Sequence, residues 1–177
     1  MSEIEKIRTE LLALQDQKNQ KFVAKLIPTL RLEQILGTKI PFLRSFAKQL
    51  FKQDKADEFL KAFPHYYLEE NLLHGFLIEQ VKDFTFAMEL TEAFLPYIDN
   101  RMVCDTFSPK IFKKFPALVY QKIKIWLNSS DSYTLRYAIG LLLSNFLNEE
   151  FKPEMLNLVA SVQSGEYYVQ MMQAWYF

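Results

Sequence analysis

Residues 99–127 read DNRMVCDTFSPKIFKKFPALVYQKIKIWL and show the spacing of short consecutive helices. A proline fits the first turn of a helix because that position needs no backbone N–H, so Pro109 and Pro116 each mark a helix start. The helices predicted here cover residues 100–107, 109–115 and 116–127. This stretch therefore predicts a helical protein with short connections.

The same stretch distributes its charge unevenly. Asp105 is the one acid within the predicted helix 100–107, and no acid occurs between Thr106 and Ser130. The lysines of this acid-free segment are Lys110, Lys113, Lys114, Lys122 and Lys124. The whole chain has no net charge, so only this local concentration argues for an anionic partner.

Helical spacing continues on both sides of this stretch, and no alternation typical of strands persists. Residues 16–20 read as a polar link, and Gly37 reads as a helix C-cap. The other predicted helices cover residues 3–15, 21–27, 30–37, 41–52, 54–63, 66–81, 82–98, 133–147, 153–162 and 166–177. They form pairs with the span of HEAT-like repeats, which predicts an all-α solenoid of stacked helix pairs with a concave face. A globular helical bundle is the structural alternative.

Composition restricts the class of protein further. The 177 residues are 50% hydrophobic and include 16 Phe and 9 Tyr, enough for one folded domain over residues 1–177. A single cysteine, Cys104, predicts a cytoplasmic protein without disulfides, and no apolar run is long enough for a membrane span. Two histidines, His65 and His74, are too few for a metal site, so we expect no metal and no cofactor. We expect His74 to pack among apolar neighbours.

The residues that could carry chemistry are few. Asp105, Arg101, Arg136 and Trp175 lie in helical, half-apolar settings, and Arg101 and Asp105 are four residues apart, where they can form an ion pair. Arg44, Lys48 and Lys52 share one helix face at the same spacing. Taken alone, these residues also fit a plain account in which the arginines and the tryptophan support the core and the lysines are solvated.

Four segments together resemble the AlkD-like DNA alkylation repair family. Residues 37–50, GTKIPFLRSFAKQL, are similar to its Gly-x-x-x-Pro-x-x-Arg-x-x-Ala-Lys segment, and residues 99–114 resemble its Asp-Asn-Trp-x-x-x-Asp segment. YTLRYAIGLLL, residues 133–143, resembles its arginine-bearing helix, and residues 164–177, SGEYYVQMMQAWYF, its Tyr-Tyr-Val…Ala-Trp segment. The segments follow the order of the family, and the resemblance extends from about Gln20 to the last residue.

The resemblance implies a monomeric protein whose basic concave groove binds duplex DNA, alkylated or distorted, near the nucleoid of a bacterium. It implies hydrolysis of the N-glycosidic bond of N3- or N7-alkylated purines, with Asp105 as the catalytic carboxylate. Arg136 then corresponds to a groove arginine and Trp175 to an aromatic of the lesion site, and we expect all three to share one concave surface. The other residues expected at the DNA are Arg101, Lys39, Arg44, Lys48, Lys110, Lys113 and Lys114.

Arg101 departs from the family pattern, which has tryptophan four residues before the aspartate. An arginine offers no aromatic face to a cationic base and repels it.

Three hypotheses for the function stay open: a DNA glycosylase for alkylated purines, a HEAT-like protein that binds bent or branched DNA without excising bases, and a helical-repeat scaffold that binds protein. Members of the family usually continue well past the Ala-Trp helix, so the resemblance also implies that this chain lacks the C-terminal repeat.

Overall fold

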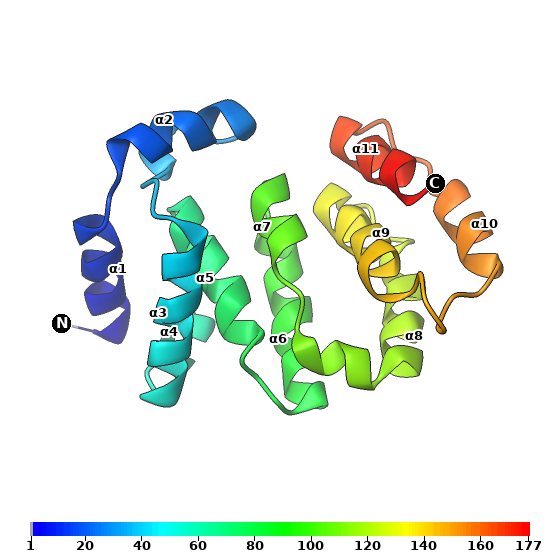
Figure 1. Cartoon of the computed structure of the whole chain (residues 1–177), viewed down its shortest axis with the longest axis horizontal. Helices are drawn as coiled ribbons and strands as arrows, with labels where there is room; N and C mark the ends of the chain where they lie inside the picture. The colour runs from blue at the N-terminus through cyan, green and yellow to red at the C-terminus, as the bar shows by residue number, and fades with distance from the viewer. Residues whose placement is uncertain (1) are drawn as a thin grey trace. The chain divides into compact units, whose positions relative to one another are not determined.

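The computed structural model describes residues 2–177 and is all helical, with no strand in that range. It divides into two compact units, one that extends to Pro109 and one that covers Lys110–Phe177 (Figure 1). Each unit consists of packed helix pairs, as the sequence predicted for an α-solenoid. The all-α fold class is therefore confirmed.

The first unit is organised around one buried helix, α5 (Leu68–Ile78), in which every residue is buried. α5 packs against α3, α6 and α7, and α1 packs against α4 and α5. In Figure 1, α2 runs crosswise to α1, α3 and α5. The other elements of this unit are α1 (Glu3–Ala13), α2 (Gln17–Leu26), η1 (Leu32–Gln34), α3 (Ile40–Lys52), α4 (Asp57–Leu60), α6 (Phe84–Phe94), η2 (Leu95–Tyr97) and α7 (Arg101–Thr106).

The second unit is organised around α9 (Ser132–Asn145), which packs against α8 and α11. Asp131 begins α9 because its side chain accepts a hydrogen bond from Thr134 N, 2.7 Å away. Trp126 and Tyr137 join α8 to α9 with ring centroids 5.8 Å apart. The other elements of this unit are η3 (Lys110–Lys114), α8 (Pro116–Trp126), α10 (Glu154–Ala160) and α11 (Tyr167–Tyr176).

Most of the predicted helices are present, but the predicted helix 30–37 is only the 3₁₀ turn η1, and the start of α2 was predicted wrongly. Residues 16–20 are not a link, because Asp16 Oδ1 accepts from Asn19 N at 3.0 Å and caps a helix that begins at Gln17. The predicted helix 109–115 is a 3₁₀ turn, η3.

Gly37 was also misplaced, because it caps no helix and follows η1 by three residues. Its φ of 83° lies in the left-handed region, and a Cβ there would approach Asp16 O to 2.3 Å. Glycine is therefore required for the close contact between the segment before α3 and the start of α2.

Among the described residues, no helix is both long enough and apolar enough to cross a membrane.

The predicted packing of His74 is confirmed, and the structure adds a partner for it. His74 is fully buried, and its Nδ1 lies 2.9 Å from Nε2 of His65. Phe59, Phe63 and Phe94 stack or tilt against the two rings. Burial lowers the pKa of His65 to about 4 and that of His74 well below its usual value, with Glu70 opposing and Arg8 adding to the shift at His65.

The free energy of unfolding should fall as the pH drops from 7 to 5. Both histidines titrate near 6.5 in the unfolded chain but stay neutral in the fold, so below pH 6.5 the unfolded state binds more protons. Each histidine can add a slope of about 1.4 kcal/mol per pH unit, as measured by urea unfolding followed by circular dichroism. A variant with His65→Gln and His74→Leu should show a clearly flatter dependence, and an unchanged slope would contradict this account.

Candidate functional site

Asp105 is exposed on α7, a short helix held at both ends. At the start, Asn100 Oδ1 accepts from Val103 N at 3.0 Å, and Asn100 itself is fully buried. At the end, Arg44 Nη2 donates to Thr106 O at 2.9 Å. The Asp105 carboxylate is thus presented to solvent from a fixed piece of backbone.

Arg44, which we expected at the DNA, is engaged within the first unit. Its Nη1 donates to the buried carboxylate of Glu79, and its guanidinium lies 4.0 Å from the centroid of the Phe76 ring. Glu79 also accepts from Ser108 N at 2.9 Å. Arg44 and Glu79 together connect α3 to the segment that contains α7, a structural role that the sequence spacing does not reveal.

Arg101 contacts the end of α2. Its Nε and Nη2 both donate to Leu26 O, each at 3.3 Å, and Leu26 is the last residue of α2. A guanidinium at a helix C-terminus satisfies a carbonyl that lacks an intrahelical partner and interacts favourably with the helix dipole. Sequence reasoning missed this contact because it joins residues 75 positions apart.

Lys39 is exposed and lines an apolar pocket of about 290 Å³ whose wall includes Met102 of α7. The buried carboxylate of Glu69 lies at this pocket and accepts from Leu36 N at 2.9 Å and from Gly37 N at 2.7 Å. Burial raises the pKa of Glu69. Glu69 therefore fixes the backbone that leads into α3, of which Lys39 is the N-cap, while Lys48 is exposed on α3.

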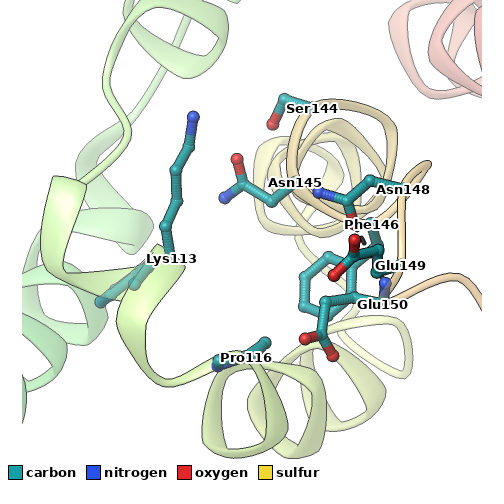
Figure 2. A pocket seen from close by; sticks show the side chains of 9 residues that line it. Lys113, Pro116, Ser144, Asn145, Phe146, Asn148, Glu149 and Glu150 are labelled. Atoms are coloured by element: carbon teal, nitrogen blue, oxygen red, sulfur yellow. Dashed lines mark hydrogen bonds between the residues drawn. The ribbon is translucent and has the colours of Figure 1, made fainter.

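In the second unit, Lys110, Lys113 and Lys114 are all exposed on η3. Lys113 lines a pocket of about 180 Å³, and Figure 2 shows it on one side with Glu149 and Glu150 on the other. The Asn145 side chain lies between them, and its buried Nδ2 has no hydrogen-bond partner among residues 2–177. Because of these carboxylates, the surroundings of Lys113 are less positive than the lysine spacing alone suggests.

Arg136 is fully buried on α9, although we expected it in a DNA groove. Its Nη1 donates to Tyr168 O, and its guanidinium lies 5.3 Å from the centroid of the Trp175 ring. Trp175 keeps 52% of its surface exposed. Arg136 therefore joins α9 to α11 and holds the exposed Trp175 ring through a cation–π contact.

The expected site residues are divided between the two units. Lys39, Arg44, Lys48, Arg101 and Asp105 belong to the first, and Lys110, Lys113, Lys114, Arg136 and Trp175 belong to the second. Their convergence on one surface stays a prediction. Among residues 2–177, no group of three or more His, Cys, Asp or Glu side chains could hold a metal ion.

The protein is thus all-helical, is built of packed helix pairs, and has an exposed aspartate and exposed lysines on its surface. The family model described as DNA alkylation repair enzyme matches residues 7–175, so the chain belongs to that family. Comparisons with curated proteins and with solved structures give no match.

Proposed function

We propose that this protein binds duplex DNA and hydrolyses the N-glycosidic bond of purines alkylated at N3 or N7. The observation that carries the proposal is membership of the DNA alkylation repair family over residues 7–175. The exposed carboxylate of Asp105 on a fixed helix supports it, because Asp105 stands where the resemblance puts the catalytic aspartate.

The chemistry needs only one carboxylate. An alkylated purine carries a positive charge, so it leaves with the electrons of the glycosidic bond and needs no general acid. The sugar then develops oxocarbenium character, which a nearby carboxylate stabilises electrostatically. Asp105 would also orient the water whose oxygen bonds to the anomeric carbon, and would accept the proton that this water loses and pass it to solvent.

Exposed lysines would hold the duplex by its phosphates, which positions DNA without reading its sequence. Lys39 and Lys48 would do so from the first unit, and Lys110, Lys113 and Lys114 from the second. Trp175 would offer its exposed ring to the lesion. Arg136 would act through Trp175, since its guanidinium is buried and bonded to Tyr168 O.

The test is release of 7-methylguanine from methylated duplex DNA. We expect the wild-type protein to release this base above the spontaneous rate, measured by chromatography of the free base. A folded protein that binds the DNA but releases no base above background would remove the enzymatic proposal.

A second candidate function, DNA binding without excision, is favoured by Arg101. Its guanidinium repels a cationic base, and both donating nitrogens are directed at Leu26 O. If this residue is what prevents excision, Arg101→Trp should create or increase base release in the same assay. Without any gain from Arg101→Trp, the missing aromatic would not explain an inactive protein.

Both functions require phosphate contacts from η3. We expect the triple change Lys110→Glu, Lys113→Glu and Lys114→Glu to weaken duplex binding and its salt dependence, because each lost phosphate contact lowers the slope of log K against log salt by about 0.9. Fluorescence anisotropy at several salt concentrations measures both quantities. Binding that responds neither to salt nor to these changes would argue against a DNA partner.

A further inference from the structure

The helix α2 presents a basic face that the expected site does not include. Lys18, Lys21 and Lys25 are spaced three and four residues apart, so they lie on one side of the helix. All three are exposed, and Phe22 between them is 60% exposed. We call Lys18, Lys21, Phe22 and Lys25 the basic face of α2.

The basic face of α2 is open to solvent, and no acidic side chain of the same helix neutralises its charge. Gln17 and the four residues of the basic face line a wide, shallow hollow on the surface. Gln17–Leu26 contains no acid, and the nearest one, Asp16, is used as the N-cap through Asn19 N. The opposite side of α2 faces the protein through the buried Val23.

The orientation of α2 is fixed at both ends. At its start, Asp16 N donates to Leu36 O at 3.0 Å, and Gly37 allows the close approach to Asp16 O. At its end, Arg101 donates twice to Leu26 O. The residue that replaces the family's aromatic is thus the residue that ties α2 to α7.

We propose that the basic face of α2 binds the phosphate backbone of DNA, and that Arg101 is a positioning residue for this face. The inference rests on the proposed DNA binding and extends it to an element outside the expected site. It assigns Arg101 a structural purpose in binding, in place of contact with the lesion.

The dimensions fit a polyanion with closely spaced charges. Lys18 and Lys25 are separated by about 10 Å along the helix axis, at 1.5 Å per residue. One strand of duplex DNA carries a phosphate about every 3.4 Å along its axis, so the three lysines can reach two or three consecutive phosphates. An isolated small anion would need only one of them.

The first experiment neutralises the basic face. The triple variant Lys18→Gln, Lys21→Gln and Lys25→Gln should bind a 20-base-pair duplex at least about tenfold more weakly at 100 mM NaCl, and its salt slope should fall by two to three. The matched control is Lys55→Gln, Lys61→Gln and Lys82→Gln, which removes the same charge from exposed positions of the same unit. The control should change affinity less than about twofold if the effect is local.

The second experiment separates positioning by Arg101 from direct contact. Arg101→Lys keeps the charge but removes the two hydrogen bonds that the guanidinium donates to Leu26 O, so a positioning role predicts weaker DNA binding although a cation remains. Combined with the α2 triple variant, Arg101→Lys should add no further loss, because the face it positions is already neutral. Hydrogen exchange of α2 amides should rise in Arg101→Lys.

The outcomes are distinct. If wild-type protein does not bind DNA, the proposed function fails and this inference fails with it. If wild type binds DNA and the α2 variant binds equally well, only the basic face is overturned. If Arg101→Lys loses nothing, or if its loss adds fully to that of the α2 variant, the positioning role is overturned. If the α2 variant loses affinity for heparin but not for DNA, the basic face binds a different polyanion and its assignment to DNA is overturned.

Discussion

Replacing Asp105 by asparagine should reduce release of 7-methylguanine by about 100-fold or more while DNA affinity stays nearly unchanged. The substitution keeps the size and shape of the side chain but removes its charge and replaces one acceptor oxygen by an NH2 donor. That charge matters most in the transition state, because in the ground state the positive charge lies on the alkylated base and it develops on the sugar only as the glycosidic bond breaks. The loss should therefore appear in the single-turnover rate and not in the dissociation constant.

Asp99→Asn provides a matched control for this variant. Asp99 is an exposed acid six residues earlier in the chain, and its Oδ1 accepts from Asn100 Nδ2 at 2.8 Å. Its loss changes the net charge by the same amount, so a general electrostatic effect on DNA binding would appear in both variants. Undiminished excision by Asp105→Asn would exclude Asp105 as the catalytic carboxylate.

Replacing Arg136 by methionine should destabilise the second unit by about 3 kcal/mol or more, since a buried polar network loses one member. Arg136 is fully buried, donates to Tyr168 O and lies under Trp175. Methionine fills most of the space but leaves the Tyr168 carbonyl with one partner fewer. Thermal unfolding followed by circular dichroism measures the loss.

Lys114→Met is the control for this variant. Lys114 is exposed in the same unit, and surface substitutions of this kind usually change stability by less than about 0.5 kcal/mol. The stability result also decides what Arg136 does. If Arg136→Met unfolded like wild type and bound DNA more weakly, Arg136 would be a phosphate ligand and its burial would not reflect the DNA-bound state.

Helical periodicity was enough to predict the elements, because local spacing and proline positions determine them. It failed at the start of α2, because the polar residues 16–20 concealed the local N-cap Asp16, and at Gly37, whose close approach to Asp16 O is a long-range contact. Side-chain roles were harder to predict. Arg44 and Arg136 are residue types expected at a DNA surface, but Arg44 bonds to the buried Glu79 and Arg136 is itself buried and bonded to Tyr168 O, contacts that no local pattern reveals.

Arg101 illustrates the same difficulty at the candidate site. The sequence located it as the departure from the family pattern, because the position four residues before Asp105 could be compared directly. Its partner, the last carbonyl of α2, is a backbone atom in a distant segment. A change of one side chain from aromatic to cationic thus becomes interpretable only when the contact between Arg101 and the end of α2 is known.

The placement of the tryptophans makes the two units spectroscopically separable. The chain has two tryptophans, and both Trp126 and Trp175 lie within Lys110–Phe177, one buried and one exposed. Both histidines lie in the other unit. Tryptophan fluorescence, excited at wavelengths that tyrosine does not absorb, therefore reports on Lys110–Phe177 alone. An acid-induced loosening around His65 and His74 would leave that fluorescence unchanged. Comparing emission with far-ultraviolet dichroism would reveal whether the protein melts as one cooperative body or in two steps.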